Sequence, residues 1–199
     1  RVAQAAGPPG RFRLANGRAA SLEPTDALAR APFLVVTDIT GSAANGRIRA
    51  AAAIERADIE DIFRGAIIEE TVWGFDAPSR SVRGRKLRRL GEVRLNEAPC
   101  PVTDFAAAAT LLARGIAEIG IAALPWSKEQ LALRGRANYL RQLLGEAWPD
   151  LSDSALAASV DDWLAPHLIG TTALADIGAD RLGEALSQLL PWSLRTEME

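Results

Sequence analysis

The residues best suited to chemistry form a basic segment over residues 80–89, with six positive charges in ten positions and no acidic residue. Positive charge at this density attracts phosphate groups, and each neutralised phosphate releases counterions, so affinity falls with salt. We predict a nucleic-acid-binding site made of Arg80, Arg83, Arg85, Lys86, Arg88 and Arg89. The alternative is internal neutralisation by the seven acidic residues between Glu55 and Asp76. The acids considered as partners are Glu60, Asp61, Glu69 and Glu70.

Most other site chemistry is excluded. A single cysteine, Cys100, excludes an internal disulfide, and a single histidine, His167, excludes zinc sites built from several Cys and His ligands. His167 follows a predicted helix end, which favours a structural role over that of a catalytic base. The pairs Glu69-Glu70 and Asp161-Asp162 consist of adjacent residues, whose side chains diverge on a strand or helix. We therefore predict no catalytic, metal or cofactor-binding residue.

Nucleotide hydrolysis by this sequence is also excluded. A phosphate-binding loop ends in Gly-Lys-Ser/Thr, but only two lysines are present, and they follow Arg85 and Ser127. Trp73 and Phe75 could stack on bases, although residues 71, 73 and 75 share a strand face and core burial is favoured. The other tryptophans are interpreted as anchors of a helical core: Trp126, Trp148, Trp163 and Trp192.

These residues belong to two halves of different character. Residues 1–100 carry 16 basic and 12 acidic side chains, whereas residues 101–199 carry 7 and 13. Apolar runs are short and strand-like before residues 99–101, and long and helical in period after them. We predict an α+β protein with two domains, a small OB-like Greek-key β-barrel over residues 1–100 and a helical bundle over residues 101–199.

The strands expected in the first half are residues 12–22, 33–39, 47–54, 67–75 and 82–95, with a helix near 56–64 between the third and fourth. Asn16-Gly17 is either a hairpin turn or a kink within one bent strand. The last strand is expected to bend at Gly84 and Gly91. Three strands, a helix and two strands are the layout of a small Greek-key barrel.

Five helical segments are expected in the second half. Thr103 or Asp104 caps the first, and Ser127 with Gln130 forms a capping box for the second. Ser152 opens a third that ends at Pro166. The last two begin at Thr171 or Thr172, and at Asp180.

Several motifs in this order give the sequence a family resemblance. They occupy residues 13–20, 31–36, 47–49, 85–91, 124–126, 148–149, 151–153, 162–166 and 189–192. Together they resemble the region that follows the motor and helical domains of HrpB-type ATP-dependent helicases, a bacterial DEAH-box group. The resemblance implies two RecA-like ATPase domains upstream, and an OB-like domain that helps line the nucleic-acid channel.

With Arg1 at the first position and the only methionine at Met198, we expect a fragment of a longer chain. Our first hypothesis is a non-catalytic region of an ATP-dependent helicase that binds single-stranded RNA or DNA. It holds no cofactor itself, and ATP and Mg belong to the parent chain. The alternative is a protein-interaction module that docks the motor domains or a partner protein. An independent hydrolase would need distant carboxylates to converge in a pocket. We expect a cytoplasmic location and no membrane contact.

Overall fold

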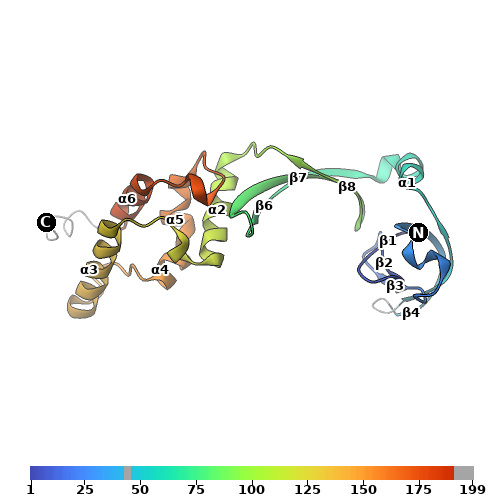
Figure 1. The fold of residues 1–199 in the computed structure, drawn as a ribbon, viewed down its shortest axis with the longest axis horizontal. Helices are drawn as coiled ribbons and strands as arrows, with labels where there is room; N and C mark the ends of the chain where they lie inside the picture. The colour runs from blue at the N-terminus through green and yellow to red at the C-terminus, as the bar shows by residue number, and fades with distance from the viewer. Residues whose placement is uncertain (43–45, 191–199) are drawn as a thin grey trace. The chain divides into compact units, whose positions relative to one another are not determined.

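The computed structural model describes residues 1–42 and 46–190, and its fold is mixed α+β (Figure 1). It divides into two compact units. The first comprises Arg1–Val72 and Arg85–Pro99, and the second comprises Trp73–Gly84 and Cys100–Glu199. The second unit therefore holds the helical half together with the tip of a β-hairpin from the first half of the sequence.

The first unit begins with a closed barrel. Its strands are β1 (Val2–Ala5), β2 (Arg11–Leu14), β3 (Ala19–Ser21), β4 (Phe33–Gly41) and β5 (Gly46–Ala53). They are ordered β1-β2-β3-β5-β4; β3 and β5 pair in parallel and the other neighbours are antiparallel. Alternate side chains fill the interior, since side chains on a strand point to opposite faces in turn. The fully enclosed ones are Ala3, Phe12, Leu14, Ala20, Leu34, Val36 and Ile48.

The structure confirms a small barrel followed by a helical bundle. The predicted layout of the first half was wrong in two respects: all five barrel strands precede the predicted helix, and this helix does not lie between the third and fourth strands. The barrel is complete by Ala53, because β1 adds a strand near the N-terminus and residues 12–22 form a hairpin of two strands. Gly17, with a φ of +83°, supplies the left-handed residue of that hairpin. The predicted helix, α1 (Arg56–Ile62), thus follows the fifth strand instead of separating the third and fourth. A short 3₁₀ helix, η1 (Ala27–Arg30), lies between β3 and β4.

A three-stranded sheet follows α1 and a short 3₁₀ turn, η2 (Arg64–Ala66). Its strands are β6 (Ile68–Asp76), β7 (Ser81–Leu90) and β8 (Val93–Cys100), with β7 in the centre. The single long strand predicted over residues 82–95 was wrong, since Gly91 has a φ of +55° and reverses the chain between β7 and β8. In the first unit, Leu90, Val93 and Leu95 pack with Val2 and Ile59 in a second small core.

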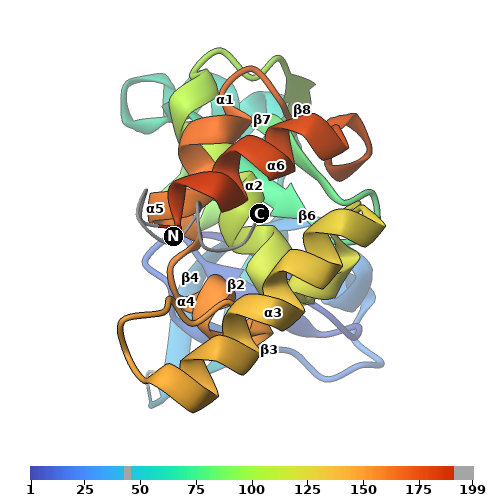
Figure 2. The same cartoon turned by 90° about the vertical axis from the view of Figure 1, so that its left-hand side faces the viewer.

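The helical unit contains α2 (Phe105–Ile119), α3 (Lys128–Leu144), α4 (Asp153–Ala158), α5 (Val160–Trp163) and α6 (Ala179–Gln188). Short 3₁₀ segments connect them: η3 (Ile121–Ala123), η4 (Ala165–Leu168) and η5 (Leu174–Asp176). Figure 2 looks onto this unit with α3 and α6 towards the viewer. Three predicted starts are confirmed: Asp104 caps α2, Ser127 and Gln130 form the capping box of α3, and Ser152 caps α4.

The later helices differ from the prediction. The expected third helix is divided into α4 and α5 at Ser159, and the helix expected from Thr171 or Thr172 is only the turn η5. The last helix has Gly178 and not Asp180 at its N-cap.

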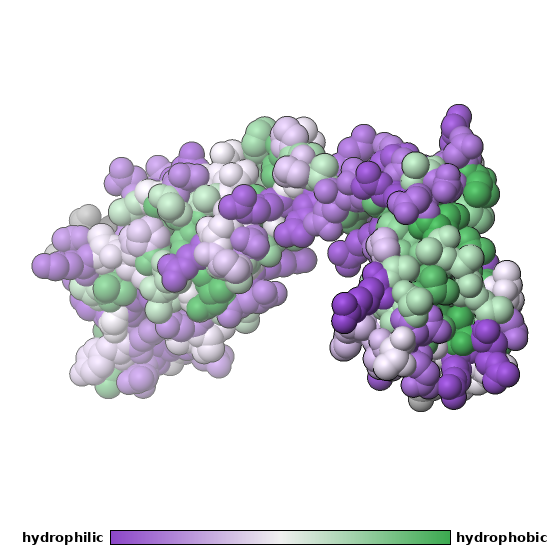
Figure 3. All heavy atoms as spheres, turned by 45° about the vertical axis from the view of Figure 1, so that its right-hand side comes forward, coloured by the Kyte–Doolittle hydropathy of each residue, from purple (hydrophilic) through white to green (hydrophobic). Residues whose placement is uncertain are grey.

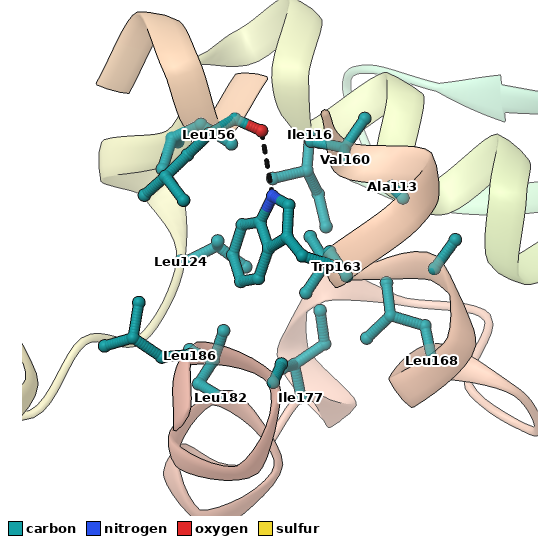
Figure 4. Close-up of a cluster of buried hydrophobic side chains, with 14 of the residues drawn as sticks. Ala113, Ile116, Leu124, Leu156, Val160, Trp163, Leu168, Ile177, Leu182 and Leu186 are labelled. Atoms are coloured by element: carbon teal, nitrogen blue, oxygen red, sulfur yellow. Dashed lines mark hydrogen bonds between the residues drawn. The ribbon is translucent and has the colours of Figure 1, made fainter. Parts of the chain in front are cut away.

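Trp163 is the centre of the helical core (Figure 4). Only 2% of its surface is exposed, and its indole nitrogen donates a 2.9 Å hydrogen bond to the carbonyl oxygen of Leu156. Trp126 stacks on it with ring centroids 6.3 Å apart, and Trp148 is buried nearby in the same core. The predicted anchoring role of these three tryptophans is confirmed, whereas Trp192 lies outside the described residues.

Apolar side chains also appear on the surface. The visible face of the barrel unit in Figure 3 shows an apolar area surrounded by hydrophilic residues. On the helical unit, Tyr139, Leu143 and Leu144 near the end of α3 are each more than 60% exposed. Among the described residues, no helix has both the length and the apolar character needed to cross a membrane.

Candidate nucleic-acid interface

Five of the six predicted site residues lie on β7, the central strand of the three-stranded sheet. The sixth, Arg80, precedes β7 in a turn, where its φ is +50° and its amide donates to the carbonyl of Ala77. A β-strand places alternate side chains on opposite faces, so the basic segment cannot present all its charges on one surface. The sheet therefore separates this cluster into two smaller groups.

Each basic side chain on β7 has an acidic partner. In the first unit the partners come from α1, β6 and β8, and the contacts are short. The pairs are Arg85–Glu97 at 2.5 Å, Lys86–Glu69 at 2.9 Å, Arg88–Glu69 at 3.0 Å, Arg88–Glu60 at 3.1 Å and Arg89–Glu70 at 3.0 Å. Three of the four acids considered as partners thus bind the segment, and the fourth, Asp61, pairs with Arg64 at 2.7 Å instead.

The remaining two cations lie in the second unit. Arg83 Nε donates to Ser79 Oγ at 3.1 Å and lies 3.8 Å from an Asp76 carboxylate oxygen. Within residues 1–42 and 46–190, Arg80 is the one member of the segment whose side chain forms no ion pair.

These ion pairs neutralise the segment without burying it. The side chains of Arg85 and Lys86 remain 54% and 55% exposed, while Arg88 and Arg89 are about one-third exposed. The hydrogen bond and charge of Lys86, helped by Arg88, hold the pKa of Glu69 below its ordinary value. Exposed pairs of this kind are screened by water and salt, so they stabilise the fold only weakly. A phosphate that binds the segment must compete with carboxylates already in place.

The other residues considered for chemistry do not form a site. Asp161 pairs with Arg114 through a 2.6 Å contact, which lowers the pKa of Asp161, and the two residues lie on the surface of the helical unit. His167 is half-buried in the last turn of η4. Over the described ranges, no three His, Cys, Asp or Glu side chains gather as metal ligands would.

The aromatic pair on β6 has a structural position. Trp73 and Phe75 pack on the helical core of the second unit. Phe75 lies against Gly115 of α2 so closely that a Cβ at residue 115 would be 2.1 Å from Phe75 Cγ. Both residues were predicted to be buried in the core of the first domain. They pack instead against the core of the second unit.

A second group of arginines lies on β2, the β2–β3 loop and β5. Because these arginines are dispersed along the sequence, local charge density does not identify them. Arg11, Arg13, Arg18, Arg47 and Arg49 are all exposed. The signal that identifies them is alternation, since buried apolar residues separate the arginines on each strand.

No family model matches the chain. It is similar over its whole length to the ATP-dependent RNA helicase HrpB of Escherichia coli (strain K12), with 28% identity over 204 residues, which are 25% of that protein. Two crystal structures are also similar. The E. coli DExH-box NTPase HrpB has 26% identity and a TM-score of 0.48, with 99% of this chain and 25% of that chain covered. The E. coli DEAH/RHA helicase HrpB has 23% identity and a TM-score of 0.47, with 100% and 25% covered.

The chain thus spans about a quarter of the length of the relatives that it matches. The resemblance to HrpB-type helicases that its motifs predict is confirmed.

Proposed function

We propose that this chain is a non-catalytic accessory region of an ATP-dependent helicase, and that it helps bind single-stranded RNA or DNA beside an ATPase motor. The observation that carries the proposal is the similarity of the whole chain to a quarter of an ATP-dependent RNA helicase. The 199 residues contain no Gly-Lys-Ser/Thr loop for nucleotide phosphates. ATP and Mg would therefore be bound by RecA-like motor domains of the parent chain, in the cytoplasm.

A closed five-stranded barrel beside a motor suits this role. Small Greek-key barrels of the OB type bind oligonucleotides along their strands and loops. The net positive charge of the first half favours phosphate contacts, which act on any base sequence. We expect binding that is weak, independent of sequence and sensitive to salt.

The test uses the purified 199-residue chain and fluorescein-labelled 20-nucleotide single strands of RNA and of DNA. Anisotropy at about 50 mM salt should show binding, with similar affinities for unrelated base sequences, since phosphate contacts carry no sequence information. The release of phosphate from ATP, measured in the presence of Mg, should stay at background. Absence of RNA and DNA binding at low salt would refute the nucleic-acid role, and ATP hydrolysis would refute the accessory role.

A second candidate is a protein-interaction module that docks the motor domains or a partner protein without touching nucleic acid. Internal neutralisation of β7 and the exposed apolar side chains near the end of α3 favour it. It predicts that Tyr139→Ser with Leu143→Ser weakens association with separately purified motor domains of the parent helicase while RNA binding is absent from the chain.

A further inference from the structure

The excess positive charge of the first half lies in the barrel and not in the basic segment. Residues 1–54 carry seven arginines and three acidic residues, whereas residues 55–99 carry nine basic and nine acidic side chains. The second stretch, which includes the segment 80–89, is therefore neutral overall. An anionic ligand is attracted by the net field of a surface, so its binding site is expected on the barrel.

Four arginines point outward from two barrel strands. Arg11 and Arg13 are exposed on β2 on either side of Phe12, which is 2% exposed. Arg47 and Arg49 flank Ile48 on β5 in the same way, and Ile48 is 4% exposed. Since successive side chains on a strand alternate between faces, burial of the central residue fixes its neighbours on the outside.

The strand register brings these arginines together on one face. Arg11 is paired with Ser21 of β3, and Ser21 with Arg47 of β5, so the three form one row across the strands. Arg13 is paired with Ala19 in the next row. With strands about 4.8 Å apart and alternate residues about 7 Å apart, the arginines form a track, and the Cα atoms of Arg13 and Arg49 at its two ends are roughly 17 Å apart.

The surface between the arginines of β2 and those of β5 carries only small side chains. Ala19 and Ser21 of β3 are small, so no large side chain separates the arginines of β2 from those of β5. Arg18, in the β2–β3 loop, adds a fifth exposed cation beside the Arg13 row. A pocket of about 450 Å³ lies at the edge of this face, and Arg11, Ser21 and Arg47 are among its lining residues.

The acidic residues of the barrel leave most of the track unneutralised. Glu23 pairs with Arg47 at 2.8 Å, and both side chains are more than 60% exposed. Asp26 accepts a hydrogen bond from the backbone N–H of Leu28 at the start of η1. Asp38 lies on β4, the strand that pairs with β5. In the described part of the chain, Arg11, Arg13, Arg18 and Arg49 form no ion pair. This contrasts with β7, where every cation has a carboxylate partner.

We propose that the outer face of β2, β3 and β5 holds the phosphates of single-stranded nucleic acid, and that Arg11, Arg13, Arg18, Arg47 and Arg49 make the contacts in place of the β7 residues. This inference rests on the proposed function and changes the site within it. Guanidinium groups bind phosphate oxygens in a planar, two-pronged geometry. A ligand on this face gains those contacts without breaking ion pairs, apart from that of Arg47.

The test compares two variants with the same loss of charge. The barrel variant is Arg11→Ala with Arg13→Ala, and its matched control is Arg85→Ala with Lys86→Ala on β7. All four side chains are exposed, and far-UV circular dichroism with urea midpoints verifies folding. The ligand is the labelled 20-nucleotide single-stranded RNA at about 0.1 M salt.

Each phosphate contact on a single strand contributes about 0.7 to the slope of log K against log salt. Loss of two contacts should lower the slope by about 1.4 and the affinity about 25-fold at 0.1 M salt. The β7 variant should stay within about twofold of the unmodified chain. Arg11→Lys with Arg13→Lys keeps the charge and should retain most of the binding.

The outcomes separate the site from the function. Loss confined to the barrel variant supports the site. Loss in the β7 variant alone, or equal loss in both, overturns the site while the proposed function stands. If the unmodified chain binds neither RNA nor DNA at low salt, the nucleic-acid part of the proposed function fails and the site fails with it.

Discussion

Replacement of Gly115 by alanine should destabilise the helical unit, although alanine is the better helix former. Gly115 is buried in α2, and an added Cβ would lie 2.1 Å from Cγ of Phe75. Carbon atoms in contact are normally about 3.5–4.0 Å apart, so the ring or the helix must move by at least about 1.4 Å. We assign roughly 3 kcal/mol to this overpacking. The gain in helix propensity of about 1 kcal/mol leaves a net loss of about 2 kcal/mol.

Gly135→Ala is the matched control. Gly135 lies within α3, is exposed, and a Cβ there meets nothing within 4 Å. The same substitution should therefore stabilise the protein by about 0.5–1 kcal/mol, since only the propensity changes.

Urea denaturation, followed by tryptophan fluorescence and circular dichroism, measures both variants. With a slope of about 2 kcal/mol per molar urea, Gly115→Ala should lower the midpoint by about 1 M, and Gly135→Ala should raise it slightly. In the double variant Gly115→Ala with Phe75→Ala the clash disappears, so the two losses should be less than additive. If Gly115→Ala is as stable as Gly135→Ala, Phe75 does not pack on α2 as described.

Three other predictions concern single residues. Gly91→Ala should cost more than about 3 kcal/mol in urea denaturation. Residue 91 has a φ of +55°, which strains any residue other than glycine, and a Cβ there would also lie 2.0 Å from the carbonyl oxygen of Ala15. The pKa of Glu69 is lowered in the folded protein, so its stabilising contribution is present above the ordinary carboxyl pKa and is lost as pH falls through the folded value. Lys86→Ala should raise the pKa of Glu69 in an NMR titration, and an unchanged pKa would contradict the pairing. Trp163→Ala should cost about 3–5 kcal/mol in the same denaturation assay, and a loss below about 1 kcal/mol would contradict its central place in the core.

The alternation of buried and exposed residues allowed much of the barrel to be predicted from sequence. Phe12, Leu14 and Ile48 show this alternation clearly, and each fills the interior. Strand β1 was missed because Val2–Ala5 contains two alanines and a glutamine, which carry little strand signal. The turn at Gly91 was misread as a bend, because the sequence does not show whether a glycine has a positive φ.

The candidate nucleic-acid interface was harder to predict from the sequence than the barrel. Local density identified the cations of β7, but their neutralisation depends on Glu60, Glu69, Glu70 and Glu97 from neighbouring elements. Three of these acids were considered from the sequence as ion-pair partners of the basic segment. The sequence does not show whether those pairs form or whether the segment is free to bind nucleic acid. The barrel arginines are far apart in sequence, and only the register of β2, β3 and β5 brings them to one face.

The salt dependence of RNA binding tests the central claim most directly. With five arginines contacting phosphates on the barrel face, each contributing about 0.7, the unmodified chain should bind a 20-nucleotide single strand with a log–log salt slope near −3.5. The affinity should be similar for unrelated base sequences. A slope near zero, or no binding to RNA or DNA at about 50 mM salt, would contradict a phosphate-binding role for this chain.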